Sequence, residues 1–406
     1  MAHILFIAYT TYVHDGRVKR HAEALAERGD RVDVLCLDSG HNGVLRGVNV
    51  IGLKMPRYRG ASRCAYALSY LRFFVKASAA ALRFSLARRY DIVVVCTMPD
   101  AAVLCALPAR LFGSRIVLDI HDTMPELYRD KFGGRRGAIG ARLLMLEERA
   151  SARCADRVLA VHALHRARLV RAGVPARKIK TVMNAPDPAF FGAAAKRRAH
   201  ANGAFTLACH GTLAPRLGLD TAIEALALVR PRIPELRMKV IGVGDYLEQA
   251  EQLTLHRNLG GCVSFIDQVP VEELPSLLAE ADVGLVPNRA SSATHLMLPV
   301  KLLDYAALGI PAIVARLRTI EHYFDEDSVR FFEPGDARGL AAAIEELHSD
   351  RERRAALARN ARRALGRIAW PIQRIEYYHA IDSLLAQAQP GPCRDPERGV
   401  QSNANN

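Results

Sequence analysis

The 406-residue sequence lacks two features that would place it in or across a membrane. No window of about 18 residues is both apolar throughout and free of charge, and a membrane-spanning helix needs roughly that length. The N-terminus has no basic region of the kind that opens a secretory signal, and Asp15 and Arg17 follow the first apolar segment too soon. We therefore expect a cytoplasmic chain without a transmembrane helix.

Cysteine is present, but it follows no pattern. The eight cysteines never form a C-x-x-C pair, so neither a disulfide framework nor a zinc site is indicated. Most of them stand in apolar runs, as Cys36 and Cys96 do, which is typical of buried thiols in a reducing compartment.

Acidic residues are absent from one long stretch, residues 39–90, which holds ten lysines and arginines. Residues 1–200 as a whole hold 34 basic and 16 acidic residues, whereas residues 201–406 hold 22 and 26. The net charge of +14 therefore comes entirely from the first half of the chain. We expect the two halves to face different partners.

Strand and helix signals alternate along a chain whose length suits two domains. Continuous β-branched runs are typical of strands buried on both faces of a parallel sheet. The predicted strands are residues 3–8, 32–37, 92–96, 116–120, 157–161, 180–183, 205–209, 238–241, 263–266, 283–286 and 312–314. Strands that alternate with helices predict an α/β protein with two doubly wound domains. The predicted parts are a first domain over residues 1–192, a second over 203–369, a C-terminal helix over 370–387 and a disordered tail over 388–406.

Functional residues are expected in the loops that follow strands, because ligands of open α/β sheets bind beyond the carboxyl ends of the strands. One such loop carries His121, Asp122 and Glu126, three titratable side chains within six residues. A histidine beside carboxylates can act as an acid, a base or a hydrogen-bond donor to a substrate. The alternative is an Asx-type turn with a structural histidine.

The loop after the predicted strand 205–209 has the composition of a phosphate site. Gly211 lets backbone amides approach a ligand at the start of a helix, and Arg216 can clamp an anion with two hydrogen bonds. The alternative is a helix capped by Asp220 or Thr221 beside a solvated arginine.

Gly242 and Gly244 resemble part of a dinucleotide-binding fingerprint. Leu247 stands where the third glycine belongs, and no acidic residue sits at the right distance at a strand end. We therefore expect a tight strand-to-helix turn here rather than an NAD site.

The segment from residue 298 to 311 reads as a short helix with a cation in its first turn. Pro299 suits the start of the helix, and Gly309 ends it. Lys301 lies where the helix dipole disfavours a cation, and a bound phosphate would remove that objection. Asp304 lies on the same face. A simple Lys301–Asp304 surface pair is the alternative.

At these residues the sequence resembles the retaining glycosyltransferases of family 4 (glycosyl transferases group 1), which adopt the GT-B fold of two Rossmann-like domains facing across a cleft. The resemblance covers about residues 1–385. The phrases that carry it are Asp15-Gly-Arg17-Val, Asp119-Ile-His121-Asp122-x-x-Pro125-Glu126, Ala155-Asp156-Arg-Val with Asn184-Ala-Pro-Asp187, His210-Gly-Thr-Leu-Ala-Pro-Arg216-Leu-Gly-Leu-Asp220, Val240-Ile-Gly-Val-Gly244, and Leu298-Pro-Val-Lys301-Leu-Leu-Asp304-Tyr-Ala-Ala-Leu-Gly309-Ile-Pro311.

The resemblance implies a nucleotide-sugar donor site in the second domain. It assigns the diphosphate to Arg216, with Lys301 supplying a charge that Leu217 lacks, and the ribose to Asp304, which stands where the family has a glutamate. The donor-binding residues it implies are Gly211, Thr212, Arg216, Gly242, Gly244, Val269, His295, Leu298, Pro299, Val300, Lys301 and Asp304. Neither a metal nor a cofactor is expected, because cations and helix termini neutralise the leaving diphosphate.

The same resemblance implies an acceptor site in the first domain and a C-terminal helix that crosses back onto it. His121 is placed near the transferred sugar, and Asp122 and Glu126 complete the catalytic candidates. Tyr12, Asp15 and Arg17 are the candidates on the acceptor side.

One position departs from the family pattern. Leu296 stands where the family has a glutamate that contacts the donor sugar, and His295 is the nearest substitute. The leading hypothesis is a retaining glycosyltransferase that acts on a lipid-linked or polysaccharide acceptor in exopolysaccharide or cell-envelope glycan synthesis. Because of Leu296, a non-catalytic GT-B-like binding protein stays open, and a GT-B nucleotide-sugar epimerase is the third hypothesis.

The acid-free stretch predicts a docking surface. Residues 62–86 predict a helix, and its period gives an apolar stripe expected to pack on the sheet, made of Leu68, Leu71, Val75, Leu82 and Leu86. A neighbouring stripe holds Arg72, Lys76 and Arg83, flanked by Tyr66, Tyr70, Phe73 and Phe84. A basic and aromatic strip over residues 57–90 indicates contact with an anionic membrane, at the inner face of the cell membrane. A solvated cationic helix is the alternative, and no nucleic-acid motif is present.

Overall fold

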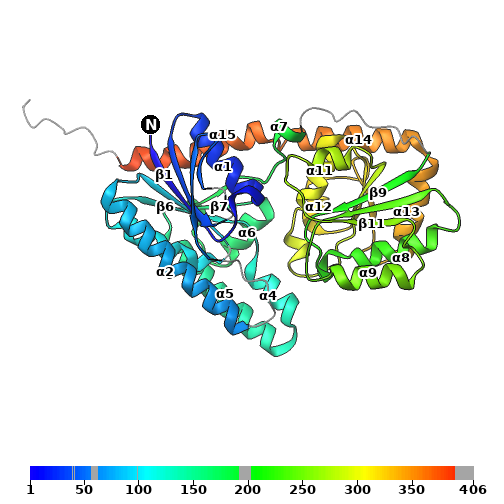
Figure 1. Ribbon diagram of the computed structural model, residues 1–406, viewed down its shortest axis with the longest axis horizontal. Coiled ribbons are helices and arrows are strands. Elements are labelled where there is room, and N and C mark those ends of the chain that lie inside the picture. The colour runs from blue at the N-terminus through cyan, green and yellow to red at the C-terminus, as the bar shows by residue number, and fades with distance from the viewer. Residues whose placement is uncertain (39, 41, 56–62, 98, 192–202, 389–406) are drawn as a thin grey trace, which may run out of the picture.

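A computed structural model of the protein describes all residues except 39, 41, 56–62, 98, 192–202 and 389–406. The predicted join near residues 192–203, the predicted tail and residues 57–62 of the basic stretch fall wholly or largely outside the described residues. The described chain forms two lobes that lie side by side (Figure 1), each built on its own sheet.

The first lobe is an eight-stranded sheet. Its strands, in spatial order, are β3 (Gly43–Leu45), β4 (Val48–Leu53), β2 (Arg31–Leu37), β1 (His3–Ala8), β5 (Ile92–Cys96), β6 (Arg115–Ile120), β7 (Arg157–Ala160) and β8 (Ile179–Thr181). Every neighbouring pair is parallel except β3 and β4. The strands that the sequence predicts are present, each within two residues of the predicted bounds. The edge hairpin β3–β4 was not predicted.

The second lobe is a six-stranded sheet in which all pairs are parallel. Its strands, in spatial order, are β11 (Val263–Ile266), β10 (Leu236–Ile241), β9 (Phe205–His210), β12 (Val283–Val286), β13 (Ala312–Ala315) and β14 (Arg330–Phe332). Only β14 is absent from the prediction. Two doubly wound, Rossmann-like α/β domains are therefore confirmed.

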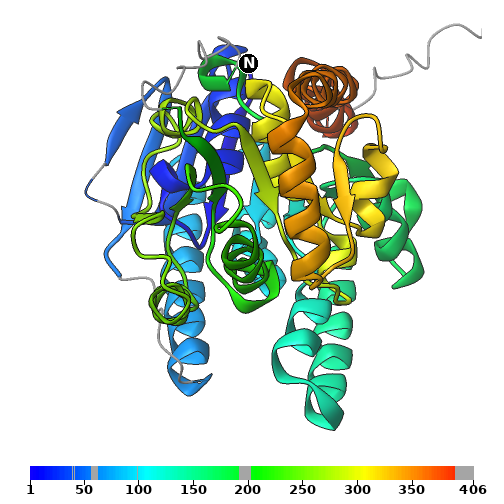
Figure 2. The ribbon, with the colours of Figure 1, turned by 90° about the vertical axis from the view of Figure 1, so that its right-hand side faces the viewer.

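Helices cover both faces of each sheet (Figures 1 and 2). Those of the first lobe are α1 (Gly16–Glu27), α2 (Arg63–Ala87), α3 (Leu107–Arg110), α4 (Met124–Phe132), α5 (Gly134–Cys154) and α6 (Ala163–Arg171), with the 3₁₀ segments η1 (Tyr12–His14), η2 (Asp100–Ala106) and η3 (Ala176–Lys178). The short helix α7 (Pro188–Phe191) follows them and packs against the core of the second lobe. Those of the second are α8 (Leu219–Val229), α9 (Leu247–His256), α10 (Leu274–Leu278), α11 (Val300–Leu308), α12 (Arg318–Tyr323), α13 (Ala337–Ser349) and α14 (Arg351–Gly366), with the 3₁₀ segments η4 (Pro215–Leu217) and η5 (Thr294–Leu296).

The last helix, α15 (Trp370–Ala388), returns from the second lobe to the first (Figure 1). Tyr377, Ala380 and Ile381 are buried in the core cluster that also contains Phe6 of β1. This is the crossing that the family resemblance implies. None of the described helices combines the length and the hydropathy that a membrane crossing requires.

Helix α2 contradicts the predicted packing. The leucine and valine stripe faces outward, with Leu71 and Val75 58% and 61% exposed, and Leu68, Leu82 and Leu86 are exposed as well. The buried face consists of Ser69, Phe73, Ala77, Ala81 and Ser85. Small side chains at a spacing of four let the helix lie close against η2 and α3, and this close approach decides which face is inside.

The aromatic side chains of α2 follow the buried face rather than the basic stripe. Phe73 is fully buried, and Tyr70 and Phe84 pack against the core of the first sheet. The side chain of Tyr66 lies outside the described set. The predicted strip of mixed basic and aromatic character is therefore wrong, and the exposed face of α2 is basic and aliphatic.

Candidate active site

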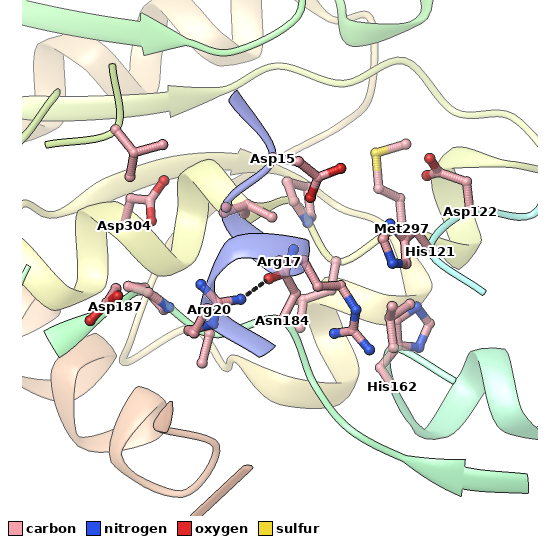
Figure 3. A pocket seen from close by; sticks show the side chains of 18 of the residues that line it. Asp15, Arg17, Arg20, His121, Asp122, His162, Asn184, Asp187, Met297 and Asp304 are labelled. Carbon is pink, nitrogen blue, oxygen red and sulfur yellow. Dashed lines mark hydrogen bonds between the residues drawn. The ribbon is translucent and has the colours of Figure 1, made fainter. Parts of the chain in front are cut away.

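A cavity of about 450 Å³ lies between the two lobes. Both lobes contribute to it, at the carboxyl ends of their strands, as expected for two facing α/β sheets. Of the predicted site residues, it is lined by Asp15, Arg17, His121, Asp122, Leu298, Pro299, Val300 and Asp304. Figure 3 shows Asp304 and Arg20 toward one end of the cavity and His121, Asp122 and Met297 toward the other.

Arg17 and Asp119 form the centre of a buried network at the floor of the first lobe. Nε and Nη2 of Arg17 donate to the Asp119 carboxylate at 2.7 to 3.2 Å, and Nη1 donates to the Val182 carbonyl at 3.0 Å. Nδ1 of His21 lies 3.4 Å from the same carboxylate. Burial raises the pKa of Asp119, but Arg17 and His121 outweigh burial and hold that pKa well below its usual range. Arg17, predicted on the acceptor side, thus lines the cavity, but its guanidinium forms an ion pair with Asp119.

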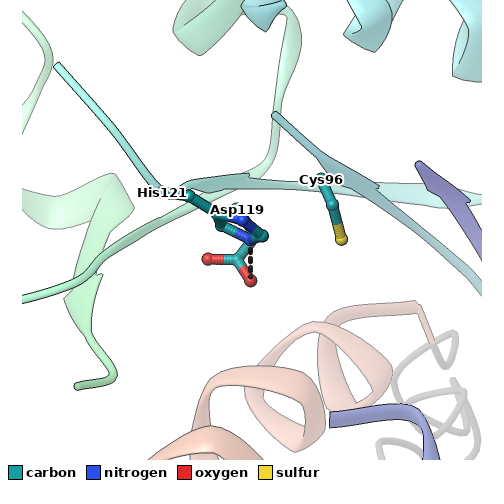
Figure 4. Close-up of side chains that lie close together, drawn as sticks. All are labelled: Cys96, Asp119 and His121. Atoms are coloured by element: carbon teal, nitrogen blue, oxygen red, sulfur yellow. Dashed lines mark ion pairs between the residues drawn. The ribbon is translucent and has the colours of Figure 1, made fainter. Parts of the chain in front are cut away.

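His121 is placed by the same carboxylate. Its Nε2 lies 3.2 Å from Asp119 Oδ2 (Figure 4), and its backbone N–H donates to Thr97 Oγ1 at 3.1 Å. Burial lowers the pKa of His121, but the negative charge of Asp119 outweighs burial and raises it. Asp122 lies beside it with a pKa raised by burial, against the opposing charges of His121 and Arg216. The cavity therefore holds an imidazole whose pKa is raised by Asp119, next to a carboxyl group whose pKa is raised by burial.

Cys96 lies beside Asp119 and His121 (Figure 4), and the three donor atoms lie within 4.8 Å of one another. Such a set can ligate a metal in principle. Both Asp119 oxygens already accept from Arg17, however, and a second cation there would meet a buried positive charge. Burial also raises the pKa of the Cys96 thiol well above its usual value. The trio therefore fits an ion-pair network better than a metal site.

Lys301 and Asp304 of α11 do not pair with each other within the described structure, so the alternative of a surface salt bridge is wrong. Lys301 is 8% exposed, and its Nζ lies 3.9 Å from the Cys209 sulfur. An added Cβ on Gly211 would lie 3.9 Å from the Lys301 Cε, which places the lysine against the loop after β9. The Gly211 amide itself donates to the Ile241 carbonyl at 2.9 Å. Lys301 is thus a buried cation beside the loop after β9, just outside the cavity lining.

Asp304 is nearly as buried, at 4% exposure, and burial raises its pKa to about 8, with Arg20 opposing. His210 Nε2 lies 3.7 Å away, but burial and the charge of Lys301 lower the pKa of His210 to about 3. The short distance is therefore not an ion pair at neutral pH, because both partners are then mainly uncharged.

The remaining donor-side predictions divide into three groups. Gly242 and Gly244 are required by packing, since an added Cβ would lie 2.1 Å from the Gly211 carbonyl oxygen and 1.9 Å from that of Leu213, which favours the tight-turn interpretation. Arg216 lies close enough to Asp122 for its charge to act on that carboxyl, and its Nε is buried with no partner among the described residues. The third group, Gly211, Thr212 and Val269, follows β9 and β11 outside the cavity lining.

Three predicted site residues are placed elsewhere by the structure. Glu126 is a structural ion pair, since both of its oxygens accept from Arg168 at 2.8 and 2.9 Å. Tyr12 is 1% exposed and packs in the core of the first sheet. His295 faces α12, with its Nδ1 accepting from the Arg318 amide at 3.4 Å. None of the three lines the cavity.

Leu296 itself lines the cavity, and its carbonyl accepts from His162 Nε2 at 2.9 Å across the gap between the lobes. The sequence did not single out His162, Lys19, Arg20 or Met297, which also line the cavity. Their common feature is that they depend on the approach of the other lobe or of a distant loop. No local spacing could have shown this.

A cavity between two Rossmann-like lobes, lined by arginines and a histidine of the first lobe and by the start of α11 of the second, defines a GT-B type of architecture and site. Two family models match the chain: glycosyl transferases group 1 over residues 193–364, and glycosyl transferase 4-like domain over residues 16–185. The chain belongs to the GT-B glycosyltransferases of group 1, as the sequence resemblance predicts.

Solved structures agree on the fold. Sucrose-phosphate synthase from Thermosynechococcus elongatus superposes with a TM-score of 0.76 at 20% identity, covering 95% of this chain and 100% of that one. HepE from Anabaena, in complex with UDP-glucose, superposes with a TM-score of 0.73 at 19% identity, covering 94% and 100%.

Curated relatives match shorter segments. A GDP-mannose-dependent α-(1-6)-phosphatidylinositol monomannoside mannosyltransferase of Mycolicibacterium smegmatis is 30% identical over 152 residues, which is 37% of this chain and 40% of that protein. The amylovoran biosynthesis glycosyltransferase AmsK of Erwinia amylovora is 26% identical over 189 residues, which is 46% of each. The matches thus span less than half of these relatives.

Proposed function

We propose that the protein transfers a sugar, with retention, from a nucleotide-diphosphate sugar to a lipid-linked or polysaccharide acceptor in exopolysaccharide or cell-envelope glycan synthesis. The observation that carries the proposal is the interlobe cavity, which brings His121 and Asp122 of the first lobe opposite the start of α11 in the second. The names of the mannosyltransferase and of AmsK support this class of reaction.

On the donor side, Lys301 and Arg216 bind the diphosphate. Both are cations without a carboxylate partner among the described ion pairs. Arg216 lies in η4, which follows β9, and Lys301 lies in the first turn of α11. Backbone amides at the N-terminus of α11 add donors for the same oxygens. These groups stabilise the charge that develops on the leaving diphosphate, so that transfer needs no metal. Asp304 accepts hydrogen bonds from the ribose hydroxyls.

On the transfer side, His121 supplies positive charge and a hydrogen bond to the reacting sugar. Asp119 keeps the ring oriented and raises its pKa, which shifts the imidazole toward the imidazolium where negative charge moves onto the leaving group. Asp122, which lines the same cavity, is the second catalytic candidate at the reacting sugar.

Leu296 favours a second candidate, a non-catalytic protein that binds the nucleotide sugar without transfer. The loop that holds it offers the cavity only apolar side chains, Ala293, Leu296, Met297 and Leu298. A GT-B nucleotide-sugar epimerase is the third candidate.

Calorimetric titration with UDP, GDP and ADP, together with a radiolabelled donor panel on membrane extract, tests the three. Transfer predicts binding of one nucleotide and label in the lipid or polymer fraction. We expect Arg216→Ala to weaken the nucleotide by about 10- to 100-fold, because a charged hydrogen bond is lost. A matched change far from the cavity, Arg359→Ala on α14, should leave binding unchanged. Binding without turnover would support the second candidate, free nucleotide without glycosylated product the third, and no binding of any nucleotide would refute the proposal.

We further propose that the outer face of the first lobe docks on an anionic membrane. Helices α2 and α4–α5 extend on the side of the sheet opposite α15 (Figures 1 and 2). Their outward side chains are aliphatic and basic: Leu71, Val75, Leu82, Ile139, Leu143 and Leu146, with Arg72, Lys76, Arg83, Arg135, Arg136 and Arg142. Helix α2 holds no acidic residue, and the acidic residues of α5, Glu147 and Glu148, are partly or fully buried. Apolar and basic side chains together are typical of a membrane-surface helix.

Sedimentation with vesicles measures this docking. Replacing Arg72, Lys76 and Arg83 with Glu should lower the partition coefficient on vesicles rich in anionic lipid by about 100-fold or more, at roughly 1 kcal/mol for each cation lost. Neutral vesicles should show little binding by either protein. The matched variant R359E/R363E/R367E, on α14 and just after it, changes the same net charge on the second lobe. An equal loss in that variant would show that only net charge matters and would contradict the docking face.

A further inference from the structure

Arg20 is a buried cation that the described residues leave largely without partners. It projects from α1 into the interlobe cavity, is 8% exposed, and lies toward the Asp304 end (Figure 3). Its Nη2 donates to the side-chain oxygen of Asn184, its guanidinium lies 5.0 Å from the Trp370 ring centre, and its Nε is buried without a hydrogen-bond partner among the described residues. No carboxylate of the described residues forms an ion pair with it.

Arg17, one turn earlier on the same helix, shows that burial here does not prevent pairing. Arg17 is 4% exposed, yet three of its nitrogens have acceptors and one carboxylate neutralises it. A buried charge without a counter-charge is costly and persists where a ligand supplies the missing anion. Burial and the charge of Arg17 lower the pKa of Arg20 to about 10, against the weaker opposing charges of Asp187, Asp304 and Asp15, none of which forms an ion pair with it. Arg20 therefore stays cationic at neutral pH.

The groups across the cavity indicate which anion is missing. Pro299 and Val300, at the start of the nine-residue helix α11, line the same cavity, so the partly positive end of that helix also faces it. Asp304 supplies little counter-charge, because burial raises its pKa to about 8 and it is mainly protonated at neutral pH. Two positive features therefore face one cavity, and the carboxylates of Asp15 and Asp187, which also line it, do not form ion pairs with Arg20.

We propose that Arg20 binds the diphosphate of the donor nucleotide from the first lobe, across the cavity from the start of α11, which carries Lys301; the inference rests on the proposed function. The phosphates are then held by cations of both lobes, and Arg20 supplies the charge that is missing at Leu217. Donor binding thereby draws the two lobes together, since the anion is the counter-charge of both. Arg20 is a binding residue, whereas Arg17 is a positioning residue that acts through Asp119.

Titration with a nucleoside diphosphate and with its nucleoside separates phosphate contacts from all others. We expect Arg20→Met to weaken UDP or GDP, whichever binds the wild type, by about 10- to 100-fold and to leave uridine or guanosine binding unchanged. Arg20→Lys should keep part of the affinity, because a point charge remains without the planar fork. Lys19→Met is the matched control, since Lys19 lines the cavity but already pairs with Glu272.

Trp370 gives a second measurement, because it is the one tryptophan of the chain and lies against Arg20. Nucleotide binding should change its emission in the wild type and in Lys19→Met, and change it much less in Arg20→Met. Equal affinity of Arg20→Met and the wild type for the diphosphate would overturn the inference and leave the proposed function standing. An equal loss for the nucleoside would overturn it too, and a loss confined to the acceptor KM would assign Arg20 to an acceptor phosphate instead. If the wild type binds no nucleotide, both proposals fail.

Discussion

The two ends of the cavity differ in whether their buried charges are paired within the protein. At the end of Asp119, the buried carboxylate has Arg17 as a forked partner and two histidines nearby, so the charges are balanced within the protein. At the end of Asp304, Arg20 and Lys301 are buried without a carboxylate partner among the described residues, and the nearby histidine is uncharged. The first arrangement stabilises the empty protein, and the second stabilises it only when an anion is bound.

The two buried aspartates show the same difference. The guanidinium of Arg17 outweighs burial and lowers the pKa of Asp119, whereas burial outweighs Arg20 and raises the pKa of Asp304 to about 8. Similar burial therefore shifts the two pKa values in opposite directions, and the difference is whether a cation forms an ion pair with the carboxylate. The balanced end positions a reacting histidine, and the unbalanced end is suited to a charged ligand.

The largest expected effect tests the balanced end. Arg17→Met leaves Asp119 buried without its counter-charge and should lower the free energy of unfolding by about 3–5 kcal/mol. Arg20→Met removes a cation that has no carboxylate partner and should leave the free energy of unfolding within about 1 kcal/mol of the wild type, or raise it. Urea unfolding of the protein without nucleotide, followed by circular dichroism, measures both.

A double variant controls this experiment. Adding Asp119→Asn to Arg17→Met removes the stranded charge and should recover part of the lost stability, because the two residues interact directly. Similar losses for Arg17→Met and Arg20→Met would contradict the division of the cavity into a balanced and an unbalanced end.

Much of the fold follows from local pattern, and the exception shows why. Continuous β-branched runs identify β5 and β6, because a strand buried on both faces shows a mostly unbroken apolar run instead of alternating polar and apolar residues. The same reasoning fails for helix α2. Hydrophobicity alone predicts that the leucine stripe is buried, but close packing on η2 buries the face that carries Ala77 and Ala81. Where a helix packs closely, side-chain size decides the buried face, and sequence alone does not show how close the neighbour is.

The site was predictable where one loop carries it and unpredictable where two distant segments meet. His121, Asp122 and Pro299 follow or precede regular elements and line the cavity as expected. Arg17 pairs with a residue 102 positions away, and Glu126 pairs with Arg168, 42 positions away. Local spacing holds no information on either partner. Sequence reasoning therefore treated the side chains of Arg17 and Glu126 as available to a substrate, whereas both form ion pairs in the structure.

A smaller effect, in the pH dependence of stability, tests the unbalanced end. Asp304 has a folded pKa of about 8, above its unfolded value, so between pH 4 and 8 the unfolded chain releases a proton that the folded protein retains. Its contribution is therefore most favourable at acidic pH and is lost as the pH rises toward 8. Asp304→Asn removes this dependence. We expect the free energy of unfolding of the wild type, relative to Asp304→Asn, to fall by at least about 1 kcal/mol between pH 5 and pH 7, at roughly 1.4 kcal/mol for each pKa unit.

Asp119 provides the control in the same pH window. Its folded pKa lies below its unfolded value, so the stability it contributes is present throughout pH 5–8 and is lost only on stronger acidification. Asp119 also raises the pKa of His121, so the comparison is made in a His121→Gln background, where adding Asp119→Asn should change stability by an amount that stays constant between pH 5 and pH 8. Urea unfolding at four pH values, at constant ionic strength and without nucleotide, measures both variants together. Parallel curves for Asp304→Asn and the wild type would mean that Asp304 is ionised in the empty protein. In that case Arg20 would have its counter-charge within the chain, and the two ends of the cavity would not differ.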